Sequence, residues 1–157
     1  MTNQQLFIRK AIKLSLENVQ TGKGGPFAAL IVKDNNIIAS GTNLVTSLND
    51  PTAHAEIIAI REACKILGTF HLRGCEMYSS CEPCPMCLGA IYWARLEKIF
   101  IASIMQDAAD VGFDDAFIYS EFSKQISERR IPMVLMAQNE ALAVFKEWKE
   151  KKDKVKY

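Results

Sequence analysis

The first hydrophobic side chains of the chain recur every three or four residues, which is the period of a helix with one apolar face. They are Phe7, Ile8, Ala11, Ile12, Leu14, Leu16 and Val19. Thr2, followed three residues later by Gln5, has the form of a capping box at a helix start. Glycines and Pro26 then break the pattern. The sequence therefore predicts a helix over about residues 3 to 20.

Short hydrophobic runs bounded by turn residues follow this helix, and they predict strands. Residues 27–33 form the first run, and residues 37–42 return after an Asp-Asn-Asn turn as its antiparallel partner. Further strands are expected at residues 76–80, 98–103 and 133–136.

Helices are expected between and after these strands. One covers residues 50–68, with Asp50 as its cap, and the others cover residues 84–95 and 139–152. Strands that alternate with helices favour a three-layer α/β/α sandwich around a central mixed five-stranded sheet. Because the pattern shows no linker or repeat, we expect one domain over residues 1–157.

Composition narrows the class of protein. Of the 157 residues, 49% are hydrophobic, which is enough for a packed core and excludes a disordered or fibrous chain. The 19 basic and 18 acidic residues give a net charge of +1, so the overall charge does not indicate a nucleic-acid partner. No hydrophobic stretch approaches the length of a membrane span or a signal segment, and we expect no membrane partner.

The chain has five cysteines, and two of them have the spacing of metal ligands. Cys84 and Cys87 lie three residues apart, so on a helix both sulfurs lie on one face and can bind one ion. The remaining Cys64, Cys75 and Cys81 are odd in number, which fits reduced thiols better than a disulfide framework. We therefore expect a cytoplasmic protein.

His54 and Glu56 complete a candidate metal centre. His54 is a third ligand, about thirty residues before the cysteines. Three protein ligands leave the fourth position of a zinc ion to water, which is typical of a catalytic site. Glu56 lies about 200° around a helix from His54, so it need not bind the same ion. We expect one zinc ion per subunit.

This arrangement predicts a hydrolytic mechanism. Helices that begin at one edge of the sheet direct their positive ends toward the metal and favour Cys84 and Cys87 as thiolates. Zinc lowers the pKa of bound water, and Glu56 is placed to take a proton from that water. The resulting hydroxide then attacks a ring carbon that carries an exocyclic amine, and ammonia leaves.

Each of these residues also has a structural interpretation. His54, Cys84 and Cys87 could form a structural zinc knuckle, and Cys81 could close it as a fourth ligand. Glu56 could serve only as a carboxylate at a helix N-terminus. The agreement of the three elements in one chain favours the catalytic interpretation.

A histidine and a glutamate two residues apart, followed later by P-C-x-x-C, are the signature of the zinc-dependent nucleobase deaminases. Over nearly its whole length the chain resembles the bacterial-type guanine deaminases, a branch of the cytidine deaminase superfamily. The stretches that carry this resemblance are GGPFAALIVKD (24–34), NDPTAHAE (49–56), SCEPCPMCLGAIYWAR (80–95) and GFDD (112–115).

The resemblance implies a cytidine deaminase-like fold and the conversion of guanine and water to xanthine and ammonia. It implies Asn43 as a hydrogen-bonding residue for the purine and Trp93 as a wall of the pocket, with Phe27 and Asp114 as further substrate-binding residues. It also implies a second proton carrier in GFDD, for which gapless alignment from the cysteine helix favours Asp115. Asn43 could instead only stabilise its turn.

The resemblance further implies a homodimer that exchanges C-terminal segments, about residues 139–157, with Tyr157 closing the active site of the partner. Without the resemblance, the lysine-rich end of the chain reads as a solvated tail. Both interpretations remain open at this point.

Two other functions share part of the pattern. A tRNA adenosine deaminase would share DPTAHAE and EPCPMC and would act on a flipped wobble base, but it should display a basic stripe. Here the C-terminal lysines are interleaved with glutamate and aspartate. A non-catalytic zinc module for protein partners would not need Glu56. Guanine deamination is therefore the leading prediction.

Overall fold

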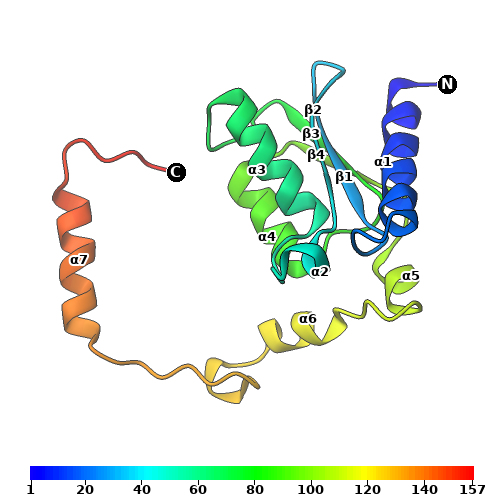
Figure 1. The fold of residues 1–157 in the computed structure, drawn as a ribbon. Helices are drawn as coiled ribbons and strands as arrows, with labels where there is room; N and C mark the ends of the chain where they lie inside the picture. Colours follow the sequence, from blue (N-terminus) through cyan, green and yellow to red (C-terminus); the bar gives the residue numbers. More distant parts are fainter. The chain divides into compact units, whose positions relative to one another are not determined.

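The computed structural model describes residues 1–157, and the chain divides into two compact units, Met1–Asp115 and Ala116–Tyr157. The first unit contains α1 (Asn3–Gln20), β1 (Ala28–Lys33), β2 (Asn36–Thr42), α2 (Val45–Leu48), α3 (Ala55–Leu67), β3 (Cys75–Ser79), α4 (Pro85–Ala94), β4 (Lys98–Ile101) and α5 (Met105–Ala109). The second contains α6 (Ala116–Ser123), the 3-10 helix η1 (Ile126–Glu128) and α7 (Gln138–Glu150) (Figure 1).

The strands form one mixed sheet of four strands in the order β2-β1-β3-β4. β1 pairs antiparallel with β2 and with β3, whereas β3 and β4 are parallel. The prediction of a fifth strand at residues 133–136 is wrong. That stretch lies in the second unit, which contains no strand and so offers it no hydrogen-bonded ladder.

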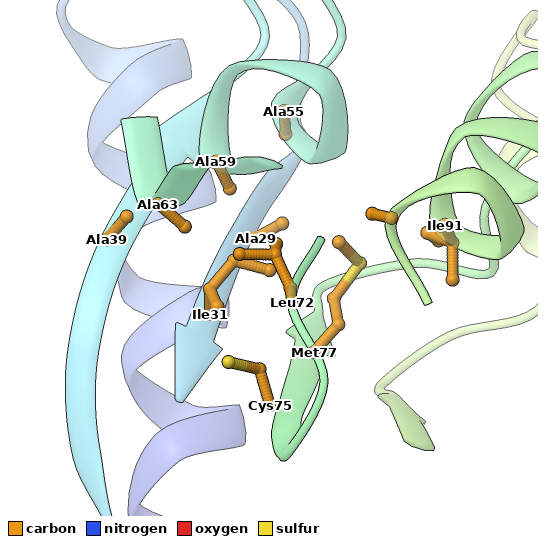
Figure 2. Packing of buried hydrophobic residues seen from close by; sticks show 11 residues of the cluster. Ala29, Ile31, Ala39, Ala55, Ala59, Ala63, Leu72, Cys75, Met77 and Ile91 are labelled. Atoms are coloured by element: carbon orange, nitrogen blue, oxygen red, sulfur yellow. The ribbon is translucent and has the colours of Figure 1, made fainter. Parts of the chain in front are cut away.

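Different helices cover the two faces of the sheet, because successive side chains of a strand point to opposite faces (Figure 1). On one face, Leu30 and Val32 of β1 pack with Ala11 of α1 and with Tyr78 of β3. The alternate residues of β1 face α3 and α4. The buried cluster on that side consists of Ala29, Ile31, Ala39, Ala55, Ala59, Ala63, Leu72, Cys75, Met77, Ile91 and Ala94 (Figure 2).

Gly41 sets the distance between β2 and the start of α3. A Cβ atom on Gly41 would lie 2.2 Å from the carbonyl oxygen of Ala55 and 2.6 Å from the backbone nitrogen of Ala59. Both atoms belong to the backbone of α3, which cannot rotate away as a flexible side chain can. The absence of a side chain at Gly41 therefore lets α3 begin directly against the sheet.

The start of α3 differs from the prediction. The helix begins at Ala55, and His54 is its N-cap with φ −72° and ψ 155°. Asp50 instead stabilises the preceding turn, where its Oδ1 accepts the Thr52 backbone N–H at 2.8 Å and the Thr52 hydroxyl at 2.7 Å. The Asp-Pro pair has the composition of a helix start, but this local hydrogen bonding to residue i+2 selects a turn.

The other predicted elements of the first unit lie within a few residues of the expected ranges. At the start of α1, Thr2 and Gln5 exchange hydrogen bonds of 3.0 Å and 3.3 Å, as a capping box requires. α3 ends at Gly68, which has φ 64°. The short helices α2 and α5, of 4 and 5 residues, were not predicted because such lengths show no hydrophobic period.

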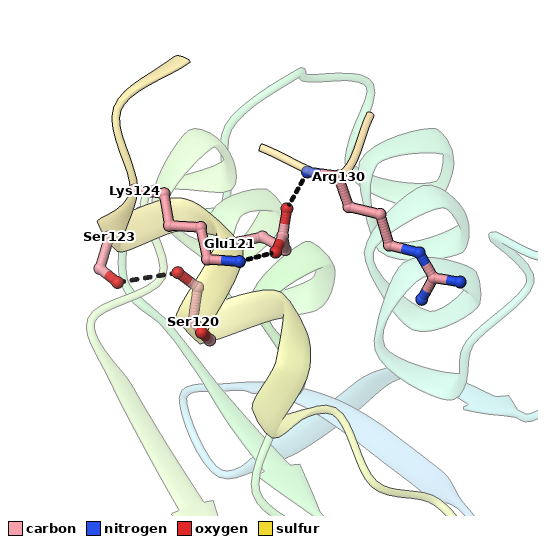
Figure 3. A network of polar contacts seen from close by, with 5 residues as sticks. All are labelled: Ser120, Glu121, Ser123, Lys124 and Arg130. Carbon is pink, nitrogen blue, oxygen red and sulfur yellow. Dashed lines mark hydrogen bonds and ion pairs between the residues drawn. The ribbon is translucent and has the colours of Figure 1, made fainter. Parts of the chain in front are cut away.

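The second unit is held by polar contacts near α6. The Glu121 carboxylate accepts Lys124 Nζ at 2.5 Å and the Arg130 backbone N–H at 2.6 Å (Figure 3). The Ser123 hydroxyl donates to the Ser120 carbonyl oxygen at 2.8 Å. None of the helices of this unit contains a buried residue. Every helix in the structure is too short or too polar to cross a membrane.

Candidate active site

The candidate metal ligands lie at the starts of two helices. His54 is the N-cap of α3, and Cys84 is the N-cap of α4, in which Pro85 takes the first position. Cys87 follows in the first turn of α4. Neither N-cap side chain makes a capping hydrogen bond, so both are available to the ligand cluster. The positive end of α4 favours the thiolate form of its N-cap cysteine, Cys84.

The distances between the ligand atoms fit zinc. His54 Nδ1 lies 3.5 Å from the Sγ atom of Cys84 and 3.5 Å from that of Cys87. All three ligand atoms lie within 4.8 Å of one another. Tetrahedral zinc, with Zn–N and Zn–S distances of about 2.0 and 2.3 Å, requires an N···S separation of about 3.5 Å. The fold therefore brings together the three residues that the sequence predicted as ligands.

The three candidate ligands set one another's protonation through direct contacts. The hydrogen bond from Cys87 lowers the pKa of Cys84 to about 4, and the same contact raises the pKa of Cys87. The hydrogen bond with Cys84 raises the pKa of His54. The ion pairs of the structure all lie among other residues, so no lysine or arginine neutralises this site. A divalent ion would take the place of the protons on His54 and Cys87, because metal ligands bind in their deprotonated forms.

Glu56 lies beside the ligands without joining them. Only 6% of its surface is exposed, and its Oε2 lies 3.4 Å from Cys87 Sγ. Ser79 donates its hydroxyl to Glu56 Oε1 at 3.4 Å. Burial raises the pKa of Glu56, which brings this carboxyl closer to the range useful for proton transfer. The expected angle of 200° between His54 and Glu56 assumed that both residues are helical. It does not apply, because His54 is an N-cap with extended backbone.

Cys81 does not close the site as a fourth ligand. It is buried, and its thiol donates to the carbonyl oxygen of Ile104 at 3.7 Å. The residues whose ligand atoms converge are His54, Cys84 and Cys87 alone. A three-ligand set favours a catalytic over a structural zinc.

Asn43 is buried just after β2. Its side-chain Oδ1 accepts the backbone N–H groups of Gly25 and Val45, each at 3.3 Å. Its backbone N–H donates to the Phe27 carbonyl oxygen at 3.0 Å. The side-chain oxygen thus stabilises the turn, as the structural alternative expected. The Nδ2 group remains available for a ligand.

The GFDD segment packs on the loop before β1. The Phe113 ring meets the Phe27 ring edge to face, with centroids 4.9 Å apart. Burial, followed by the charge of Cys84, raises the pKa of Asp115. The Oδ1 atom of Asp115 is buried without a hydrogen-bond partner, whereas Asp114 is exposed. The Asp115 carboxyl is therefore close enough to Cys84 for the charge of that residue to affect its pKa.

Trp93 and Tyr157 are both exposed in the single chain. Trp93, on α4, has 69% of its surface exposed, and Tyr157, in the second unit, has 72% exposed. Their expected roles at the purine pocket remain predictions.

Two buried polar residues near the site, Ser79 and Asn18, were not predicted from the sequence. Ser79 ends β3 and donates to Glu56, whereas Asn18 lies in α1 and bonds to the Asn43 backbone. A signal for Asn18 was present, because an asparagine among the apolar positions of a helix is unfavourable unless its amide is used. No sequence signal distinguished Ser79 from an ordinary strand residue.

Comparisons with known proteins agree with this geometry. Residues 1–103 match the family model described as the cytidine and deoxycytidylate deaminase zinc-binding region. The chain is 53% identical over 155 residues to the guanine deaminase of Bacillus subtilis (strain 168), covering 99% of each chain. The X-ray structure of guanine deaminase from Bacillus subtilis superimposes with a TM-score of 0.95, covering 98% of each chain.

A more partial match lies among enzymes that act on tRNA. The chain is 41% identical over 101 residues to the tRNA-specific adenosine deaminase of Aquifex aeolicus (strain VF5), covering 64% of this chain and 66% of the relative. The match to the guanine deaminase, in contrast, covers both units of this chain. On the ligand geometry and these matches together, the chain belongs to the cytidine and deoxycytidylate deaminase zinc-binding family.

Proposed function

We propose that this protein is a guanine deaminase that uses zinc to hydrolyse guanine to xanthine and ammonia. The observation that carries the proposal is the full-length match, at 53% identity, to a guanine deaminase. The ligand atoms of His54, Cys84 and Cys87 also lie within 4.8 Å of one another in this chain. Zinc bound by these residues would make a water molecule acidic enough to serve as a nucleophile near neutral pH.

Glu56 is proposed as the main proton carrier. It is buried next to the ligands, and its raised pKa favours both accepting a proton and returning it. The hydrogen bond from Ser79 orients one carboxylate oxygen, which leaves Oε2 on the side of Cys87. Glu56 can therefore take the proton of the attacking water and deliver it to a ring nitrogen of the base.

Asp115 is proposed to protonate the leaving amine. An amide anion is too basic to depart, so a second proton is needed while Glu56 serves the ring. The raised pKa of Asp115 and its unpartnered buried oxygen support this assignment over Asp114. Asn43 is proposed to recognise the purine edge through Nδ2, with Phe27 and Trp93 as apolar walls.

A homodimer with exchanged C-terminal segments is proposed as the working form, with Tyr157 closing the site of the partner. The second unit supports it, because most of its large apolar residues are exposed and such surfaces mark interfaces. In this view both units form one domain, assembled from two chains. Analytical ultracentrifugation is expected to give twice the 17.6 kDa chain mass; a monomer at micromolar concentration would argue against the exchange.

A cytoplasmic role in purine breakdown is proposed from the same features. All five cysteines are free thiols, which fits a reducing compartment.

The proposed function is tested by incubating the purified zinc-loaded protein with guanine, adenine, cytosine, cytidine and an anticodon stem-loop. We expect ammonia and an equal amount of xanthine from guanine, and little ammonia from the other substrates. Inosine formation in the stem-loop without guanine turnover would support the tRNA alternative. The Glu56→Gln variant in the same assay controls for contaminating deaminases.

A further inference from the structure

Asn18 is a buried amide near the end of α1. Only 2% of its surface is exposed. It belongs to a helix that packs against the face of the sheet opposite to α3 and α4 (Figure 1). Its side chain therefore comes from outside the elements that carry the metal ligands.

Both N–H bonds of the Asn18 amide are used. Nδ2 donates to the carbonyl oxygen of Asn43 at 2.8 Å and to that of Gly25 at 2.9 Å. Since both partners are acceptors, the nitrogen and not the oxygen must occupy this position. The Oδ1 atom is buried without a hydrogen-bond partner, which is unfavourable. The contribution of Asn18 is therefore the pair of bonds that it donates.

These bonds clamp the turn that carries Asn43. The Asn43 Oδ1 atom accepts the Gly25 N–H at 3.3 Å, and the Asn43 N–H donates to the Phe27 carbonyl oxygen at 3.0 Å, so each segment donates a hydrogen bond to the other. A Cβ atom on Gly24 would lie 2.1 Å from the Asn43 carbonyl oxygen, which shows how closely the loop covers it. One residue on, the Leu44 N–H donates at 2.9 Å to the carbonyl oxygen of Ala53, the neighbour of His54.

We propose that Asn18 is a positioning residue for guanine binding, which holds the Asn43 backbone so that the Asn43 Nδ2 group faces the purine. The inference rests on the proposed function and extends it to a side chain whose hydrogen bonds go to the backbone of Gly25 and Asn43. Loss of the clamp would let the Asn43 turn move while Glu56 and the ligands stay in place.

The first test uses Asn18→Asp, which keeps the shape of the side chain but places an oxygen against two carbonyl oxygens, and Asn18→Ala, which removes the amide. We expect the KM for guanine to rise about tenfold or more, with kcat within about threefold and zinc content unchanged. An unchanged KM in a folded variant, even with a lower Tm, would reduce Asn18 to a structural residue and overturn the inference.

Thr21→Ala is the matched control. The Thr21 hydroxyl donates to the carbonyl oxygens of Glu17 and Asn18, at 2.8 and 3.3 Å, so this variant also loses hydrogen bonds at the end of α1. None of them reaches the Asn43 turn, and we expect its KM to stay within about twofold. An equal rise of KM in Thr21→Ala would mean that general loosening of α1 is the cause, and it would overturn the inference.

A double-mutant cycle with Asn43→Ala decides whether Asn18 acts through Asn43. We expect the double variant to have the KM of Asn43→Ala alone, because Asn18 cannot position the Asn43 side chain once that side chain has been removed. Independent, multiplying effects on KM would contradict the inference. If Asn18→Ala does not fold, the cycle with Asn18→Asp gives the same decision. The unsubstituted chain is assayed in parallel. If it does not turn over guanine, the proposed function is wrong. If it turns over guanine normally and the Asn18 variants have an unchanged KM, the inference about Asn18 is wrong.

Discussion

The two units of the chain place their hydrophobic residues in opposite environments. In Met1–Asp115, both faces of β1 are buried, and every buried side chain of the molecule lies in this unit. In Ala116–Tyr157, Val134, Met136 and Phe145 are 78%, 79% and 68% exposed. Burial of apolar surface is the main driving force of folding. The first unit buries such surface in its own core, whereas the second unit by itself leaves these apolar side chains exposed.

The candidate chemistry divides in the same way. The metal ligands, Glu56 and Asn43 all belong to the first unit, where the sheet and the starts of α3 and α4 hold them. Among the candidate site residues, Tyr157 alone belongs to the second unit. We therefore expect changes in the first unit to remove chemistry or stability, and changes in the second to alter closure of the site.

Loss of a metal ligand is expected to have the largest effect. Cys87→Ala should abolish stoichiometric zinc binding and lower kcat/KM by about a thousandfold or more, because the metal supplies several kcal/mol of transition-state stabilisation. Metal analysis and guanine turnover measure the two effects. Cys64→Ala, a cysteine substitution away from the cluster, is the control and should keep one zinc per chain. Full activity of Cys87→Ala would contradict the ligand assignment.

Glu56→Gln is expected to lower kcat by roughly a hundredfold or more while zinc stays bound, because the amide cannot carry the proton. Steady-state kinetics with metal analysis separate these outcomes. Glu62→Gln changes an exposed carboxylate on the same helix and should leave kcat within about twofold. Near-normal turnover of Glu56→Gln would remove Glu56 from the mechanism.

Gly41→Ala should destabilise the first unit by about 3 kcal/mol, because the added carbon would meet the α3 backbone at 2.2 Å. Urea unfolding measures the change. Gly89→Ala is a matched control: its added carbon meets nothing within 4 Å, and removing a helical glycine should stabilise α4 by about 0.5 to 1 kcal/mol. Similar midpoints for the two variants would show that the contact at Gly41 is not tight.

Deletion of Val155–Tyr157 tests the second unit and should have the smallest effect, a loss of about tenfold in guanine turnover with zinc content and Tm preserved. The truncated chain keeps every residue of the first unit, so its core and ligands stay intact. Lys156→Ala in the full chain controls for a charge effect of the tail. If the truncated protein turns over guanine as fast as the full chain, Tyr157 does not close the site.

Much of this protein followed from local patterns. The periods of hydrophobic residues located α1 and α3, and short hydrophobic runs located the strands of the sheet, because each of these elements buries one face or both. The spacing of His54, Cys84 and Cys87 predicted the metal centre, since zinc requires particular atoms at particular distances. A short sequence motif can encode such a requirement directly.

Other features depended on the tertiary structure. The sequence by itself determined the ligands, but only the folded backbone decided that His54 and Cys84 are N-caps and that α3 begins at Ala55. The hydrophobic run at residues 133–136 resembled a strand, yet a strand forms only where a partner edge is present, and its own unit has none. The bonds from Asn18 to the Asn43 turn cross 25 residues of sequence, and such long-range contacts arise from packing that no local pattern records.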